Sequence, residues 1–144
     1  MSCEWERVDT TTHQDHVIAH VVGAKVLAYF IFDETLHLLL DIGFIWTIYV
    51  DGQMVLLPHP VAVGELEIDE STKAKVKNDI ARILSDGGPR DELECLVYPP
   101  AECVIKEVGL CASGDQRLIV LTGEDASLTI ETSMVSGEIK VARI

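Results

Sequence analysis

Three histidines close together in the sequence form its densest set of potential metal ligands. They are His13, His16 and His20. In a helix opened by the capping pattern of residues 12–15, the three imidazoles would share one face and offer nitrogen ligands to Zn²⁺ or another divalent ion. The β-branched residues within 17–22 favour a strand instead, in which only His16 and His20 point the same way. The sequence predicts a divalent-metal site here, with surface or hydrogen-bonded histidines as the plain alternative.

Three carboxylates in the first third of the chain are candidates for acid–base chemistry. They are Asp33, Glu34 and Asp41. Glu34 and His37 also match the E-x-x-H spacing of di-iron helix bundles, but such a site needs a second copy of the motif and several helices. The carboxylates are equally typical of turns between strands, and His37 is typical of a partly buried histidine bonded to a carboxylate. We expect turn residues rather than a catalytic pair.

Most aromatic residues lie between positions 29 and 49, so a curved sheet lined by them would enclose a small apolar ligand. Trp46 and Tyr49 are the candidate ligand-binding residues. Packing in an ordinary hydrophobic core accounts for the same aromatic residues.

Motifs with a known catalytic mechanism are missing from the sequence. It contains no G-x-S-x-G elbow, H-E-x-x-H, P-loop, G-x-G-x-x-G or EF-hand pattern. The four cysteines also match no Cys-x-x-Cys spacing; they are Cys3, Cys95, Cys103 and Cys111. We therefore expect reduced structural thiols and assign no catalytic activity.

The composition limits the classes of protein that this chain can represent. Its 144 residues are enough for one domain, which we place at 1–144, and the 48% hydrophobic content excludes a disordered chain. A net charge of −13 opposes binding to nucleic acid or to anionic lipid. No apolar stretch approaches the roughly 20 residues of a membrane helix, and no secretory signal is visible. These features predict a soluble, cytoplasmic protein.

The mean hydropathy of +0.25 is high for so acidic a chain. A second copy of the chain that covers apolar surface would reconcile the two, so we expect a homo-oligomer, most simply a homodimer. A well-filled monomeric core with its charges on loops is the alternative.

Short apolar runs separated by turn residues fill residues 17–63 and indicate an antiparallel meander. Asp51-Gly52 predicts a two-residue type I′ hairpin. In Val26–Phe32 both alternating sets of residues are apolar, so this strand should be covered on both faces by a helix, a sheet or a partner. Further strands are expected at 93–98, 103–110, 117–121, 127–132 and 138–144.

One amphipathic helix is predicted over residues 69–88, capped by Asp69 or Ser71 and ended by Gly87-Gly88-Pro89. Its apolar stripe should pack on the sheet; the stripe consists of Val76, Ile80, Ile83 and Leu84. The predicted fold class is α+β, a mainly antiparallel meander, open or barrel-like, with this one helix packed on it.

The function expected from the sequence is a homodimeric binding or interaction module. One alternative is a metal-binding protein or metal-dependent enzyme that uses the N-terminal histidines His13, His16 and His20. The other is a protein that binds a small apolar ligand at Trp46 and Tyr49.

Overall fold

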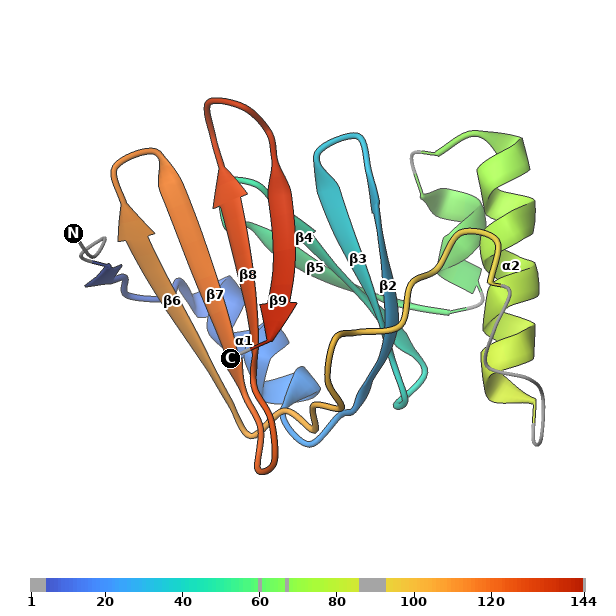
Figure 1. The fold of residues 1–144 in the computed structure, drawn as a ribbon, viewed down its shortest axis with the longest axis horizontal. Coiled ribbons are helices and arrows are strands. Elements are labelled where there is room, and N and C mark those ends of the chain that lie inside the picture. The colour runs from blue at the N-terminus through green and yellow to red at the C-terminus, as the bar shows by residue number, and fades with distance from the viewer. Residues whose placement is uncertain (1–4, 60, 67, 86–92, 144) are drawn as a thin grey trace.

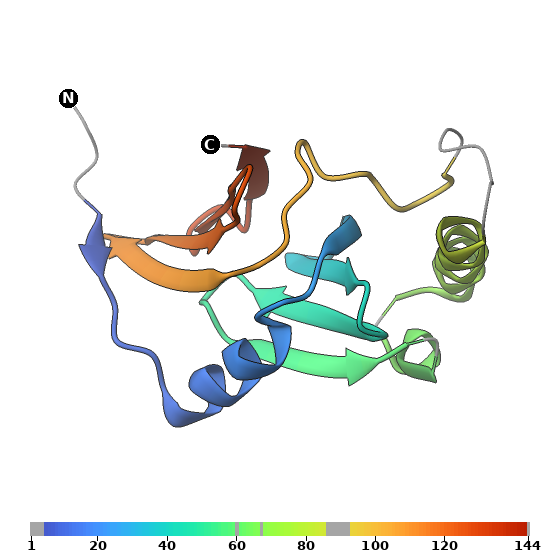
Figure 2. The ribbon, with the colours of Figure 1, turned by 90° about the horizontal axis from the view of Figure 1, so that it is seen from below.

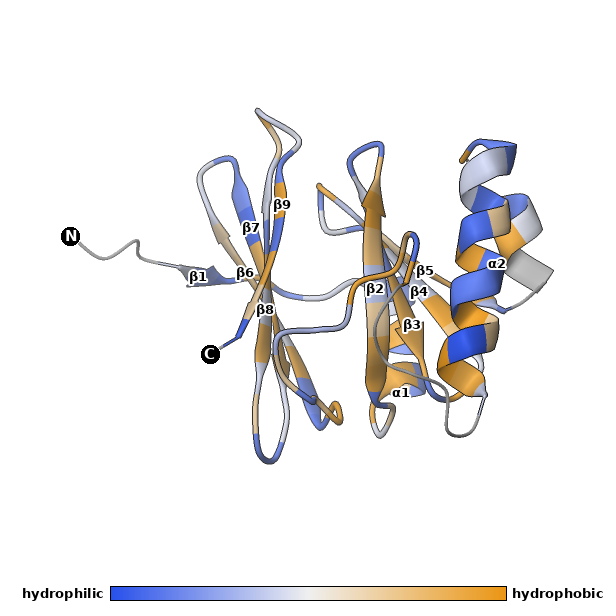
Figure 3. Ribbon diagram, turned by 45° about the vertical axis from the view of Figure 1, so that its right-hand side comes forward, coloured by the Kyte–Doolittle hydropathy of each residue, from blue (hydrophilic) through white to orange (hydrophobic). Residues whose placement is uncertain are grey.

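The structure, a computed structural model, describes residues 5–59, 61–66, 68–85 and 93–143. These residues form three layers: a five-stranded sheet, a four-stranded sheet and a helix (Figures 1 and 3). The elements in chain order are β1 (Glu6–Arg7), α1 (Thr12–Val21), β2 (Val26–Phe32), β3 (Thr35–Leu40), β4 (Phe44–Tyr49), β5 (Met54–Pro58), the 3₁₀ helix η1 (Val61–Glu65), α2 (Glu70–Leu84), β6 (Glu107–Ser113), β7 (Gln116–Thr122), β8 (Leu128–Ser133) and β9 (Ile139–Arg143).

Both sheets are antiparallel, and each is built almost wholly from strands that follow one another along the chain. The strand orders are β2-β3-β4-β5 and β1-β6-β7-β8-β9. The predicted α+β class and meander are therefore confirmed. The two sheets remain separate and do not close into a barrel, and the described residues contain a second α-helix, α1, that the fold prediction did not include.

The main hydrophobic core fills the space between the two sheets. Alternate residues of β3 point into it, namely Leu36, Leu38 and Leu40, because side chains alternate between the faces of a strand. Ile119 and Ile130 approach from the facing sheet. Helix α1 closes one side of this core with Val17 and Val21, and Figure 2 shows it between the two sheets.

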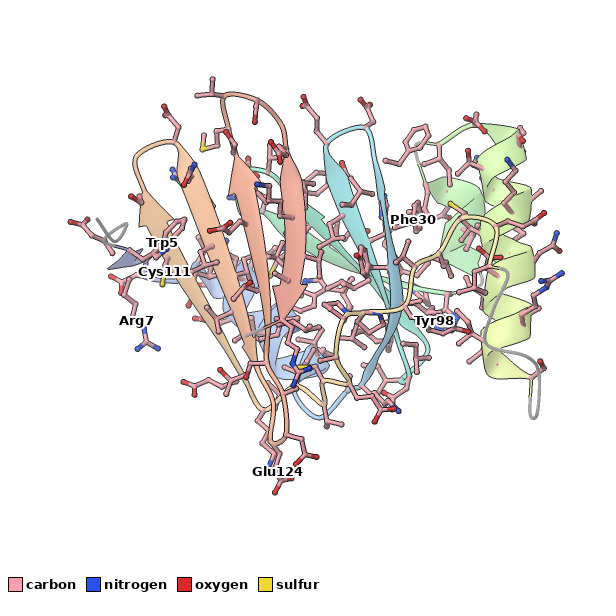
Figure 4. The ribbon with its side chains drawn as sticks, viewed as in Figure 1. Trp5, Arg7, Phe30, Tyr98, Cys111 and Glu124 are labelled. Atoms are coloured by element: carbon pink, nitrogen blue, oxygen red, sulfur yellow. The ribbon has the colours of Figure 1, made fainter. Side chains whose placement is uncertain are left out.

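A second core cluster lies on the opposite face of the four-stranded sheet, under α2. Val76 and Ile80 of the helix pack there against Ala28, Phe30 and Leu39, and Figure 4 shows Phe30 on the α2 side of β2. The expectation that β2 is covered on both faces is thus confirmed. The covers are the second sheet and a helix of the same chain.

Helix α1 settles the conformation of the N-terminal histidine segment. Its N-cap is Thr11, whose hydroxyl accepts the Gln14 N–H at 3.1 Å, while the Gln14 side chain accepts the Thr11 N–H at 2.9 Å. This capping box satisfies two otherwise unpaired donors. The preference for a strand at residues 17–22 was wrong, because capping and packing of Val17 and Val21 outweigh the β-propensity of single residues.

Two hairpin turns differ from the predicted arrangement. Asp33 and Glu34 both have positive φ, 48° and 61°, and Phe32 pairs with Thr35, so the two-residue type I′ turn lies here. At the turn predicted as type I′, only Gly52 has positive φ, and Tyr49 pairs with Gln53 across three residues. That turn is a three-residue loop with glycine at the bulge position, and the type I′ prediction was wrong.

The segment that follows α2 is irregular where two strands were expected. The described part of 93–98 forms only an isolated bridge between Val97 and Tyr29, and β6 begins at Glu107 rather than at 103. Pro99-Pro100 supplies no N–H donors, which prevents a continuous ladder. Helix α2 begins as predicted, with Asp69 as its N-cap, but it ends at Leu84 with Ser85 as its C-cap, earlier than predicted, and Gly87-Gly88-Pro89 lies outside the described residues.

Candidate functional site

The three predicted metal ligands lie on α1 with exposed side chains, but they do not form one cluster. His13 turns toward the sheet, where its Nε2 donates to the Met54 carbonyl at 3.1 Å. His16 and His20 lie side by side, with ring centroids 5.1 Å apart. Within the described residues, no group of three or more histidine, cysteine or acidic side chains is placed to hold a metal ion. The geometry therefore offers a pair of imidazoles rather than a triad.

Trp46 and Tyr49, the predicted ligand-binding residues, lie on opposite faces of β4, because they are three positions apart in a strand. Trp46 is wholly buried between the sheets, while Tyr49 is 41% exposed at the end of the strand. The Trp46 indole N–H has no hydrogen-bond partner among the described residues. The structure does not bring these two residues together around a common space.

The three candidate carboxylates do not come together either, because Asp41 lies far from the other two. Asp33 and Glu34 form the turn before β3, and Asp41 follows its other end, which at the rise of a strand places them about 20 Å apart. Asp41 instead accepts the Lys25 N–H at 2.9 Å. The turn interpretation fits all three residues.

His37 is buried beneath α2 rather than paired with a carboxylate. It stacks on Phe30 with centroids 4.6 Å apart, and its Nδ1 lies within hydrogen-bond distance of Thr47. Burial lowers the pKa of His37 from 6.5 to about 4, so the imidazole is neutral at physiological pH. A cavity of about 10 Å³ beside it, lined also by Val76 and Leu96, is barely large enough for one water molecule.

The described cysteines have structural surroundings. Cys95, Cys103 and Cys111 carry free thiols, as expected. Burial raises the pKa of both Cys95 and Cys103, which keeps these thiols protonated and poorly nucleophilic. Cys3 lies outside the described residues. Cys95 and Cys103 thus provide no activated nucleophile.

The edges of the two sheets are a further candidate site, one that the sequence patterns do not reveal. An edge strand presents unpaired N–H and C=O groups that another chain can pair with, so proteins usually cover or shorten such edges. β1 is only two residues long. β2 is bridged at Tyr29 by Val97 through hydrogen bonds of 2.9 and 2.8 Å, and Lys25, directly before β2, is bridged by Val104. β2 is therefore a poor template for pairing, and beside the short β1 a stretch of three β6 residues, 107–109, has no neighbouring strand on that side among the described residues.

β5 is protected in another way. The Tyr49 N–H donates to the Gln53 carbonyl, so these two residues form a hydrogen-bonded pair. Hydrogen-bonded and non-hydrogen-bonded pairs alternate along an antiparallel ladder, so the backbone groups of Met54, Leu56 and Pro58 point away from β4. The Met54 carbonyl already accepts from His13, and Pro58 has no N–H. Leu56 keeps both outward groups, while Met54 and Pro58 keep one each, so this edge is only partly blocked.

The outward backbone groups of β9 have no such cover among the described residues. The Ser133 N–H donates to the Glu138 carbonyl at 3.0 Å, so by the same alternation Ile139, Val141 and Arg143 direct their backbone groups away from β8. No other described segment forms a ladder or an isolated bridge with this side of β9. Of the four sheet edges in the described chain, this five-residue strand is the one most open to pairing.

No protein-family model, curated protein or solved structure matches this chain. Within the part of the chain that the structure describes, neither helix has the length and apolar character required to cross a bilayer. The candidate sites therefore rest on the geometry of β9 and of the α1 histidines alone.

Proposed function

We propose that this protein is a homodimeric interaction module that assembles by pairing β9 of one copy with β9 of another. The observation that supports this proposal is the five-residue edge of β9, the longest edge whose outward backbone groups all lack a partner among the described residues, while the other three edges are bridged, partly blocked or very short. Antiparallel pairing about a two-fold axis would join the two five-stranded sheets into one continuous sheet.

The outward backbone groups define one register. Hydrogen-bonded pairs must join outward-facing residues, so a two-fold axis at Val141 pairs Val141 with itself and Ile139 with Arg143 of the second copy. All three outward-facing residues of each copy then find partners. Shifting the axis to Lys140 or Ala142 leaves one of them unpaired.

This register also avoids direct contact between like charges. It places Lys140 opposite Ala142 of the second copy and Arg143 opposite Ile139. Within its own chain Lys140 already lies 3.5 Å from Glu138 and faces Glu131 on β8. No two side chains of like charge therefore lie directly opposite each other in this register. Like charges in such positions would destabilise the pairing of the two strands.

The apolar character of the strand supports the same arrangement. Ile139 is buried, and Val141 packs against the core between the sheets. Pairing two β9 strands would continue this apolar layer across the two-fold axis, as the high mean hydropathy of the acidic chain led us to expect.

The test is the solution mass of a matched pair of variants, Val141→Pro and Val141→Ala. Proline removes an N–H that points away from β8, so the β8–β9 ladder keeps its hydrogen bonds, while alanine removes the same side-chain packing and keeps the N–H. We expect wild type and Val141→Ala to have twice the 15.8 kDa chain mass by light scattering, and Val141→Pro to be a folded monomer.

Two results would overturn the proposal. A wild-type protein that stays monomeric up to millimolar concentration forms no such dimer. A Val141→Pro protein that remains dimeric places the interface elsewhere. Circular dichroism of each variant checks that it is folded.

A further inference from the structure

His16 and His20 are paired on the exposed face of α1 in a way that suits metal chelation. Residues four positions apart lie on the same side of a helix, one turn apart. Their ring centroids are 5.1 Å apart with the ring planes inclined by 46°, and both side chains are exposed. Two nitrogens bound to one tetrahedral Zn²⁺ at 2.0–2.1 Å are about 3.3 Å apart, a spacing that small rotations of two such rings provide.

The hydrogen bond of His20 selects the nitrogen that would bind. Its Nδ1 lies 2.8 Å from the His16 carbonyl oxygen. A carbonyl only accepts, so Nδ1 carries the proton and Nε2 holds the free lone pair. Imidazoles that bind metals commonly donate their other N–H to a backbone carbonyl, which fixes the ring orientation. His20 is therefore already oriented as a ligand.

His16 has both ring nitrogens free of hydrogen bonds to the described residues, whereas His13 is held by the Met54 carbonyl. That bond orients His13 toward β5. His16 and His20 are thus available to bind a metal ion and His13 is not, although all three lie on one ten-residue helix. His13 is a matched control within the same element.

We propose that His16 and His20 form a two-histidine chelate for one Zn²⁺, or another imidazole-binding divalent ion, per chain. Imidazole suits Zn²⁺, Ni²⁺ and Cu²⁺, while Mg²⁺ prefers oxygen ligands. Water fills the remaining coordination positions, because no third protein ligand is placed there among the described residues. This site lies on α1, away from β9, and does not depend on the proposed dimer.

The experiment titrates chelator-treated protein with Zn²⁺ at pH 7.5, using isothermal calorimetry and the side-chain NMR signals of the histidines. We expect one Zn²⁺ per chain and shifted signals from His16 and His20. Replacing either by alanine should weaken binding by at least about tenfold, since even outer-sphere changes at metal sites cost 10–100-fold. His13→Ala and Cys111→Ser should bind as wild type does. Lowering the pH to 5 should release the ion, since protons compete for the same lone pairs.

Three outcomes would overturn the proposal: absence of saturable Zn²⁺ binding, loss of binding in His13→Ala or Cys111→Ser, and full binding in both His16→Ala and His20→Ala. Because alanine favours the helix, the His16→Ala variant keeps α1 folded. The light-scattering mass is recorded with and without Zn²⁺, so failure of the metal site and failure of the β9 dimer are read separately.

Discussion

His37 Nδ1 lies 2.9 Å from the Oγ1 of Thr47, the residue directly opposite it on β4. Both side chains are buried beneath α2, and Phe30 stacks on the other side of the imidazole. A polar pair in this position costs little while the histidine is neutral, because the hydrogen bond compensates for lost water. Protonation of the ring would place an uncompensated charge in this layer.

The stability of the protein should therefore fall as the pH drops from 6.5 to 4. Burial lowers the pKa of His37 to about 4 in the folded state, against 6.5 for a free histidine. Between these values the unfolded chain binds the proton and the folded chain does not, so the full stabilisation is present above pH 6.5 and is lost on acidification. The size of this contribution is roughly 3 kcal/mol. Urea unfolding at pH 7 and pH 4.5 measures it.

The control for this effect is a pair of histidine variants. His37→Gln keeps a hydrogen-bonding group toward Thr47 but does not titrate, so its loss of stability over the same pH range should be smaller than that of wild type. His20→Gln alters an exposed histidine and should follow wild type. Equal pH dependence in all three proteins would contradict the assignment.

Asp79 should be among the most sensitive polar positions in the protein. It is fully buried on α2, and its carboxylate accepts the N–H groups of Glu94, Cys95 and Leu96 at 2.6–2.8 Å. Asp79→Ala would leave three donors without a partner, and we expect a loss of about 3–5 kcal/mol in the free energy of unfolding. Hydrogen exchange should accelerate first at residues 94–96. Asp115→Ala, at an exposed turn, should change neither quantity appreciably.

Two residues of the predicted apolar stripe of α2 should respond differently to truncation. Ile80 is 5% exposed and packs on the sheet, whereas Leu84 is 54% exposed in the last turn. Ile80→Ala should cost about 2–5 kcal/mol through lost burial and the cavity left behind. Leu84→Ala should stay within about 0.5 kcal/mol of wild type. Comparable losses in thermal unfolding would show that α2 does not pack as described.

Glycine at position 34 should stabilise the β2–β3 hairpin. Glu34 has φ of 61°, a left-handed conformation that costs an ordinary residue about 1–2 kcal/mol, and glycine relieves it at an entropic cost of about 0.5–1 kcal/mol. Glu34→Gly should therefore raise the unfolding free energy by about 0.5–1 kcal/mol. Glu34→Ala keeps the strained backbone and should bring no gain. A gain in both variants would point to the charge rather than to the backbone.

The sequence predicted those parts of the fold that depend on local pattern. Helix α2 follows from its apolar periodicity and the Asp69 cap, and the two meanders follow from apolar runs divided by turn residues. The apolar faces of β2 showed that this strand is enclosed. Each of these signals is contained within a window of a few residues, so no knowledge of distant contacts was needed.

The features that the sequence reading missed depend on contacts between distant residues. α1 is stabilised because Val17 and Val21 pack into the core between the two sheets, and helix or strand propensities of single residues do not predict such packing. The separation of His13 from His16 and His20 depends on a carbonyl 41 residues away. The free edge of β9 is defined by which other edges are covered, a property of the whole sheet. In the sequence, only the position of this strand at the end of a run of hairpins indicated that β9 would form the edge of a sheet.

The order of the strands also has a consequence for how the chain folds. Six of the seven strand pairings join neighbours through a single hairpin, and only β1 with β6 spans most of the chain. Hairpins form within microseconds, since little chain entropy is lost in closing a short loop. The first meander is complete by Pro58, before most of the polypeptide has left a ribosome. Each meander can thus form locally, and we expect the slower event in folding to be the packing of the two sheets around Trp46.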